Sequence, residues 1–110
     1  MIVFEVRAGE LLAELNRQAA EAGITHAAIV SLIGAADSFV VSTMPKGDAR
    51  KDMITKHDVP AEMTGNGEIR DGVVHLHVVM GVEGGRAIVG HLHEAVIGTH
   101  FARVYVIAIR

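Results

Sequence analysis

The sequence contains no cysteine, no tryptophan and only two prolines. Without thiols the chain can form neither a disulfide nor a cysteine-ligated metal site, so any metal must be bound by histidine and carboxylate side chains. Aromatic residues make up only 4% of the chain, which leaves a core to be built from aliphatic side chains and methionine. Half of the residues are hydrophobic, and we expect one domain over residues 1–110.

The sequence also lacks an excess of positive charge. Its formal net charge is −3 with neutral histidine, so its composition gives no reason to attract a polyphosphate, and nucleic acid is a poor default partner. The sequence contains neither a basic-then-apolar leader nor an apolar run long enough to span a bilayer. The lack of cysteine fits a cytoplasmic protein, so we expect a cytoplasmic location and no membrane partner.

The hydrophobic pattern predicts a short strand followed by an amphipathic helix. Residues 2–6 alternate weakly between apolar and polar side chains, as in a short opening strand. The segment GELLAELNRQAAEAGI repeats apolar side chains at helical spacing, beginning with Leu11 and Leu15. Gly23 follows this pattern directly and is predicted to end the helix as a left-handed cap.

Two strands and a surface segment are predicted next. HAAIVSLIG is typical of a buried strand, Gly34 permits a bend, and residues 37–43 resume as a second strand rich in β-branched side chains. Residues 44–60 combine proline, glycine and charged side chains without a sustained period. We interpret them as a surface excursion that is mobile or that packs over a site or a neighbouring subunit.

From residue 61 the pattern predicts a series of strands. Asp71-Gly72 is a dipeptide that hairpins favour, and Gly84-Gly85 predicts the next turn. The glycines of TGNGEI are interpreted as a bulge or turn, because no helix follows them that would complete a phosphate-binding loop. One helix followed by many strands predicts an α+β fold with an antiparallel-rich sheet.

Four histidines form two His-x-His motifs inside these predicted strands. Because alternate side chains of a strand share a face, His75 and His77 are predicted to point the same way, and His91 and His93 repeat the arrangement. Three neutral imidazoles are a common ligand set for zinc. The alternative is that these side chains are packed or hydrogen-bonded without a metal. The remaining histidines are interpreted as ordinary loop or strand-end residues: His26, His57 and His100.

Two long segments carry a family resemblance. RAGELLAELNRQAAEAGITHAAIVSLIGAA and GEIRDGVVHLHVVMGVEGGRAIVGHLHEAVI together resemble the plants and prokaryotes conserved (PPC) domain. The resemblance covers residues 3–109, and its most specific part is HLH followed by GHL. It implies an α+β fold around an antiparallel sheet, a homotrimer, and a divalent metal, most simply zinc, bound by His75, His77 and His91.

The resemblance has limits that bear on function. In plants the domain follows an AT-hook in nuclear DNA-binding proteins, whereas this sequence contains no RGRP-like hook and no basic arm, so DNA binding is not carried over. The first glycine of the family's G-G-H-L turn is Val89 here, and position 93 is a histidine. Arg103 stands where many relatives carry an acidic residue.

These observations leave three functions open. The first is a metal-binding homotrimer in which His93 is a fourth ligand or a hydrogen-bonding partner of the site. The second is a metal-dependent, hydrolase-like enzyme, for which Glu62, Glu68 and Glu94 are the carboxylates to inspect as a general base. The third is an interaction module that binds a protein partner, a small molecule or, with less support, DNA. A trimer further predicts that the strands at 96–97 and 104–109 are not fully covered within one subunit.

Overall fold

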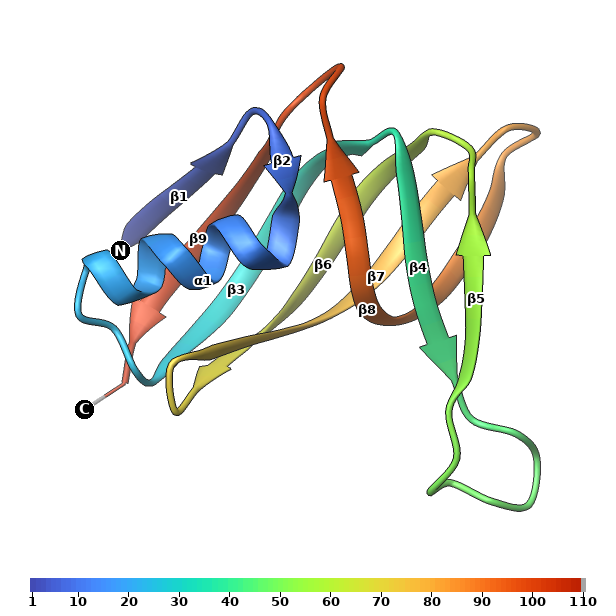
Figure 1. The fold of residues 1–110 in the computed structure, drawn as a ribbon, viewed down its shortest axis with the longest axis horizontal. Helices are drawn as coiled ribbons and strands as arrows, with labels where there is room; N and C mark the ends of the chain where they lie inside the picture. The colour runs from blue at the N-terminus through green and yellow to red at the C-terminus, as the bar shows by residue number, and fades with distance from the viewer. Residues whose placement is uncertain (110) are drawn as a thin grey trace.

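Nine antiparallel strands and one helix make up the computed structural model, which describes residues 1–109 (Figure 1). In chain order the elements are β1 (Ile2–Val6), β2 (Gly9–Glu10), α1 (Leu11–Glu21), β3 (Ala27–Ala36), β4 (Ser38–Thr43), β5 (Met53–His57), β6 (Ala61–Arg70), β7 (Val73–Val82), β8 (Arg86–Ile97) and β9 (Ala102–Ala108). The predicted antiparallel sheet and single amphipathic helix are confirmed. The two-residue strand β2 was not predicted.

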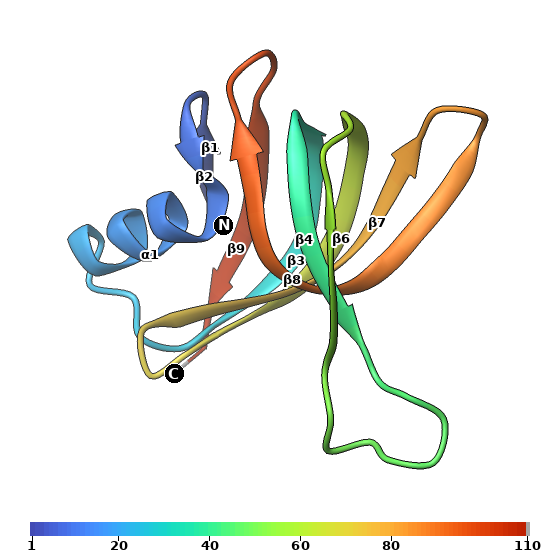
Figure 2. The same ribbon diagram turned by 45° about the vertical axis from the view of Figure 1, so that its right-hand side comes forward.

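The strands lie in the order β1-β9-β3-β6-β7-β8-β4-β5, and β2 pairs with β8 away from this path. Strand β1 is at one end of this order and β8 is near the other end. Because β2 follows β1 closely in the chain and pairs with β8, these two parts of the sheet approach each other, and the sheet is strongly curved (Figure 2). Helix α1 packs against β1, β7 and β8 on the inner side of this curve. The largest fully buried side chains are Leu11, Leu15, Ile29, Leu32, Phe39, Leu76, Met80, Leu92 and Ile97.

The sheet face that points away from this core is called the outer face below. It carries the exposed apolar side chains Val30, Ile33, Val79 and Val89, with exposed fractions of 40–54%. In β3 and β7 each of these residues has a buried neighbour, as expected for strands with one face in the core, and in β8 Val89 is flanked by half-buried residues. No helix covers the outer face within residues 1–109.

Helix α1 begins and ends at residues that suit its termini. The Glu10 carboxylate accepts hydrogen bonds from the backbone N–H groups of Leu12 and Ala13, both at 3.0 Å, and from that of Ala95 in β8, also at 3.0 Å. One acidic side chain therefore caps the helix and ties it to the sheet. Gly23, with φ of 69°, has the left-handed conformation that the sequence predicted.

The two predicted hairpin turns are confirmed. Asp71 and Gly72 both have positive φ, 51° and 77°, which is the combination that a tight turn between β6 and β7 requires. Gly84 and Gly85, with φ of 84° and 70°, lie in the connection of residues 83–85 that joins β7 to β8. These turns set the register of the strands that carry the histidines.

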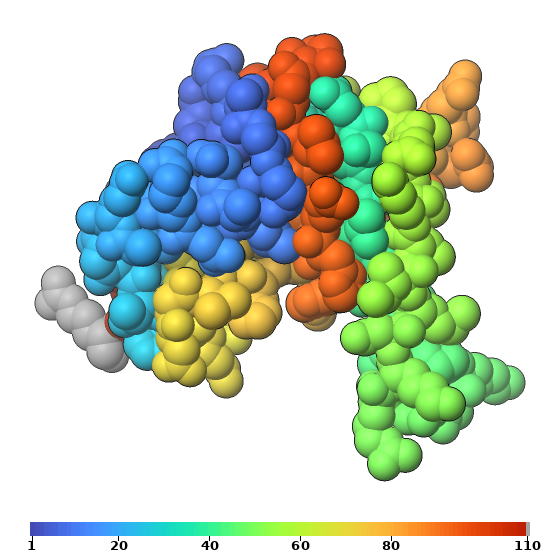
Figure 3. Space-filling model, viewed as in Figure 1, coloured from blue at the N-terminus to red at the C-terminus, as the bar shows by residue number. Residues whose placement is uncertain are grey.

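The interpretation of residues 44–60 as a surface excursion missed a strand. Residues 53–57 form β5, which pairs with β4, while the segment between the two strands projects beyond the body of the molecule (Figures 1 and 3). We call residues 44–60 the arm. Four of the five residues of β5 are exposed, so this strand lacks the alternating hydrophobicity from which a strand is predicted.

The glycines in TGNGEI form no turn, but they lie beside a bulge: the register between β3 and β6 shifts between Ile29, which pairs with Gly67, and Leu32, which pairs with Gly65. Gly65 and Gly67 lie inside the continuous strand β6, and neither has a positive φ. A Cβ atom at Gly67 would collide with the carbonyl oxygen of His75, and one at Gly65 with that of His77. The two glycines allow β6 and β7 to approach closely where the sheet curves.

The bend predicted at Gly34 is also misplaced. Strand β3 continues through Gly34 to Ala36, and its irregularity is a register shift between Ile29 and Ser31. Gly34 is required for another reason: a Cβ there would collide with the carbonyl oxygen of Phe101.

The exposure that a trimer predicts for the strands at 96–97 and 104–109 is observed for only some of their residues. Ile97, Val104 and Val106 are at most 2% exposed within the single chain, whereas Val96 and Ile107 are 36% and 46% exposed. No helix within residues 1–109 is long and apolar enough to cross a membrane.

Candidate metal centre

Strand β7 presents its two histidines on the outer face. His75 and His77 are exposed, and the intervening Leu76 and the following Val78 are buried in the core. The alternation of the strand therefore places both imidazoles on one side, as the sequence predicted.

Strand β8 brings His91 beside them. His77 and His91 are paired in the register between β7 and β8, and their ring centres are 5.4 Å apart. The ring centre of His91 lies 6.3 Å from that of His75. A Cβ at Gly90 would lie only 2.5 Å from the carbonyl oxygen of Ser42 in β4, so glycine at this position allows β4 and β8 to pack closely.

His93 joins the same group through an irregularity in β8. The register with β4 shifts between Val40 and Val41, which pair with Glu94 and Leu92, so His93 is the extra residue of a β-bulge. Its ring centre is 5.2 Å from that of His91. We call the four side chains His75, His77, His91 and His93 the histidine cluster.

Ser42 belongs to the site and was missed from the sequence. Its Oγ lies 2.8 Å from Nε2 of His93, and it is the only buried polar or charged residue within residues 1–109. The two residues are 51 positions apart, and no motif links them. This hydrogen bond gives His93 a partner that does not depend on a metal.

The electrostatic environment favours neutral imidazole at the centre of the cluster. Burial lowers the pKa of His91, and the neighbouring His93, His77 and His75 lower it further, whereas Asp52 in the arm opposes the shift. A metal ion requires the same neutral form, because only an unprotonated ring nitrogen can donate its lone pair.

The side chains of the histidine cluster are of a type that binds zinc. Two imidazoles that share a zinc ion, with each nitrogen about 2.0–2.1 Å from the metal, have ring centres roughly 5 Å apart. The spacings of His77 and His93 from His91 fit this value, and that of His75 is about an ångström longer. Within residues 1–109, however, no three histidine, aspartate or glutamate side chains are already arranged to hold an ion. The imidazole nitrogens suit zinc in chemical type, but the exposed rings of the cluster must rotate before they can bind one ion together.

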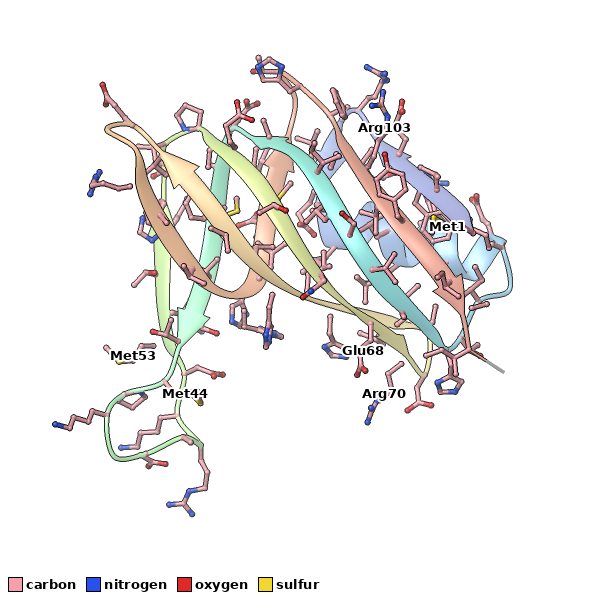
Figure 4. The ribbon with its side chains drawn as sticks, turned by 180° about the vertical axis from the view of Figure 1, so that it is seen from behind. Met1, Met44, Met53, Glu68, Arg70 and Arg103 are labelled. Atoms are coloured by element: carbon pink, nitrogen blue, oxygen red, sulfur yellow. The ribbon has the colours of Figure 1, made fainter. Side chains whose placement is uncertain are left out.

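The three candidate carboxylates lie in different places. Glu68 is paired with His75 in the register between β6 and β7, and its carboxylate lies 3.1 Å from Nε of Arg70 (Figure 4). Glu62 lines a separate hollow at the opposite end of β6. Glu94 is exposed on β8, next to the bulge. Only Glu68 shares a hollow with two of the histidines.

Two hollows are each lined by two or more residues of the histidine cluster. One, of about 510 Å³, is lined by Ile29, Val30, Asn66, Gly67, Glu68, His75 and His77. The other, of about 430 Å³, is lined by Ser42, Thr43, Met44, Ala49, Asp52, His77, Gly90, His91 and His93. The second hollow includes residues of the arm, so the arm forms one wall beside the cluster.

The other three histidines lie outside the cluster, as predicted. His26 precedes β3 and is 3.6 Å from the carboxylate of Asp71. His57 ends β5 and stacks on Phe39 with 4.9 Å between ring centres. His100 lies in the connection between β8 and β9.

The fold and the histidine cluster together define a class: a small α+β domain with one curved antiparallel sheet, whose outer face carries imidazole groups. The sequence profile of the family described as the Plants and Prokaryotes Conserved (PCC) domain matches residues 1–109. The chain therefore belongs to this family, which confirms the resemblance found in the sequence. No curated protein matches the chain.

Solved structures with the same fold come from bacteria and archaea. A proposed DNA-binding protein from Ralstonia eutropha is 18% identical, with a TM-score of 0.81 over 97% of this chain and 76% of that one. A PPC protein from Pyrococcus horikoshii is 23% identical, with a TM-score of 0.76 over 99% and 80%. A metal-containing protein from Archaeoglobus fulgidus is 25% identical, with a TM-score of 0.74 over 94% and 76%.

Proposed function

We propose that this protein is a metal-binding homotrimer, that its metal is zinc, and that His75, His77 and His91 are the ligands. The observation that carries the proposal is the convergence of these side chains from two adjacent strands, with ring centres 5.4 and 6.3 Å from that of His91. The Archaeoglobus relative, described as metal-containing, adds support from a protein of the same fold.

The residues around these ligands have separate roles in the proposal. Nε2 of His93 is hydrogen-bonded to Oγ of Ser42 at 2.8 Å. The His93 ring, thus fixed, packs beside His91 and limits the rotation of that imidazole. Asp52 offsets part of the positive charge that a dication would add. Zinc itself would supply Lewis-acid chemistry at an open coordination position.

The metal is tested by its content per chain. Untagged protein, purified without nickel resin and then incubated with zinc and desalted, is analysed by plasma mass spectrometry beside a His75→Ala, His91→Ala double variant. We expect about one zinc per chain in the wild type and none in the double variant. A His26→Ala, His100→Ala variant is the matched control, because it removes two exposed imidazoles outside the cluster. Equal zinc content in all three proteins would refute the site.

The trimer is supported by the uncovered outer face. Val30, Val79 and Val89 of this face border one hollow and have exposed fractions of 40–54%, which is unusual for a sheet face that borders only water. Light scattering at micromolar concentration should give three times the mass of the chain, and Val79→Asp should lower it. A wild-type monomer under these conditions would exclude the trimer.

One observation favours a second candidate function, a metal-dependent hydrolase. Glu68 lies opposite His75 across β6 and β7 and lines the same hollow of about 510 Å³. A carboxylate in this position could accept a proton beside the proposed ligands. If hydrolysis of a model ester or phosphoester depends on zinc, Glu68→Gln should abolish it while the zinc content stays unchanged. Hydrolysis that survives this variant would exclude Glu68 as the base.

DNA binding, which the description of the Ralstonia relative raises, is tested separately. Phosphate contacts weaken steeply as salt rises, so retention on immobilised duplex DNA should fall between low and physiological ionic strength. With a net charge of −3 we expect no such retention. Salt-sensitive retention would instead support a nucleic-acid-binding function.

A further inference from the structure

Two arginines gather around one aromatic ring. One of them, Arg103, lies far from the arm residues Met44 and Met53 (Figure 4). The guanidinium carbon of Arg103 lies 4.2 Å from the ring centre of Phe101, and that of Arg7 lies 5.6 Å away. The Glu5 carboxylate binds both: Oε1 lies 2.6 Å from Nε of Arg7, and Oε2 lies 2.9 Å from Nε of Arg103. We call Arg7 and Arg103 the arginine pair.

The bonding pattern leaves donor groups free for another anion. Both bonds to Glu5 use Nε, so the terminal amino groups of both guanidinium groups are available. An arginine whose guanidinium group is already held loses less side-chain entropy when it binds a ligand. Glu5 and Phe101 therefore preorganise the pair.

The charge of this group is positive although that of the protein is negative. Two guanidinium groups face one carboxylate, which leaves an excess of one positive charge. Hydrogen bonds from Arg103 and Arg7 lower the pKa of Glu5, so the carboxylate that holds the pair together stays ionised at neutral pH.

The aromatic platform is fixed by the connection between β8 and β9. The carbonyl oxygen of Phe101 accepts a hydrogen bond of 3.0 Å from the backbone N–H of Ala35. Two residues earlier, the backbone N–H of Thr99 donates to the carboxylate of Asp37 at 3.1 Å. This connection is thus anchored to β3 and to the residue that follows it, and it holds Phe101 beneath the arginine pair.

A hollow adjoins the arginine pair. It has a volume of about 170 Å³ and is lined by Ile33, Gly34, Ala35, Glu62, His100 and Phe101. Arg103 pairs with Ile33 in the register between β3 and β9, and Ile33 lines the hollow. Phe101 lines it as well, so the hollow lies directly beside the arginine pair. Most of its wall is apolar or backbone, and Glu62 supplies a carboxylate.

We propose that the arginine pair and this hollow form a binding site for a small organic monoanion, independent of the histidine cluster. A carboxylate of the ligand accepts hydrogen bonds from the terminal amino groups of Arg7 and Arg103. Its apolar body lies in the hollow against Ile33 and the Phe101 ring. Glu62 disfavours a second negative charge on the ligand, so the site selects monoanions over dianions.

The test uses benzoate as the probe and the neutral benzamide, which has the same framework, as its control. The ¹⁵N-labelled protein is titrated at constant ionic strength while its amide and arginine Nε–H signals are followed. We expect saturable shifts at Arg7, Arg103 and Phe101 with benzoate and none with benzamide. Arg103→Gln should weaken benzoate binding by about tenfold or more. Arg50→Gln, which changes an arginine paired with Asp48 in the arm, should not.

Three results would overturn the proposal. These are shifts that rise linearly without saturation, equal responses to benzoate and benzamide, or unchanged binding in Arg103→Gln. If Arg103→Gln does not give a folded spectrum, Arg7→Gln supplies the same comparison, because Glu5 still holds the remaining arginine. The charge preference is tested with phthalate, which should bind more weakly than benzoate to the wild type. The difference between the affinities for benzoate and phthalate should be smaller in Glu62→Gln. Equal affinities of the wild type for benzoate and phthalate would refute the preference for a monoanion.

Discussion

Replacement of Gly67 by alanine is predicted to be strongly destabilising. The added Cβ would overlap the carbonyl oxygen of His75, an atom of the neighbouring strand's backbone that cannot rotate away. Strands β6 and β7 would have to separate in the middle of the sheet, where Gly67 pairs with the buried Leu76. Gly81→Ala is the matched control, because the nearest atoms to a Cβ at Gly81 lie at 3.7 and 3.8 Å, an ordinary contact.

The magnitude follows from these contacts. Overpacking at a well-packed site typically costs about 1–3 kcal/mol, and a clash with backbone in a central strand belongs at the upper end, about 3 kcal/mol. Gly81→Ala should change the free energy of unfolding by less than about 1 kcal/mol, since it removes backbone freedom without a clash. For a domain of this size a loss of about 3 kcal/mol lowers Tm by roughly 10 °C or more.

Urea unfolding followed by circular dichroism, at one protein concentration for all variants, measures this difference. Gly67→Ala should also weaken zinc retention, because the clash displaces the backbone of a proposed ligand. Equal midpoints for Gly67→Ala and Gly81→Ala would show that β6 and β7 can separate without cost, and the explanation given for the glycines of β6 would then be wrong.

Three further predictions concern the helix cap and the histidine cluster. Glu10→Ala removes the acceptor for three backbone N–H groups and should cost about 1–2 kcal/mol in urea unfolding; an unchanged midpoint would show that water replaces the carboxylate. The folded-state pKa of His91 is below its ordinary value of 6.5, so the unfolded chain takes up the proton first, and the metal-free protein should lose stability as pH falls below about 6.5. His91→Gln should reduce this pH dependence, and an identical profile would contradict the shift. Ser42→Ala should destabilise the metal-free protein by about 1 kcal/mol by leaving Nε2 of His93 without its partner, whereas Thr43→Ala, at an exposed neighbour, should not.

Local patterns in the sequence were sufficient for the helix and the turns. The apolar spacing from Leu11 to Ala19, the cap at Gly23 and the turn at Asp71-Gly72 depend on neighbouring residues, and all three are observed. The common face of His75 and His77 could be predicted for the same reason, because the alternation of a strand is also a local property.

Features that depend on contacts between distant segments could not be predicted. A glycine signals a turn when only its neighbours are considered, whereas Gly65 and Gly67 are required by the backbone of another strand. Strand β5 has no apolar alternation because its side chains are mostly exposed on both faces. The contact between Ser42 and His93 arises only once β4 lies beside β8.

The position of β9 has a consequence for how the protein folds. This strand follows all the others in the chain, yet it lies between β1 and β3 in the sheet. During synthesis β1 therefore has no strand on either side until β9 leaves the ribosome, and the hairpin of β6 and β7 can form long before the sheet is continuous. Pairing the first strand with the last demands closure of a loop nearly as long as the chain, which is typical of slow folders. The segment that contains Ile2, Val3 and Phe4 is therefore made early and stays unpaired until β9 has been synthesised.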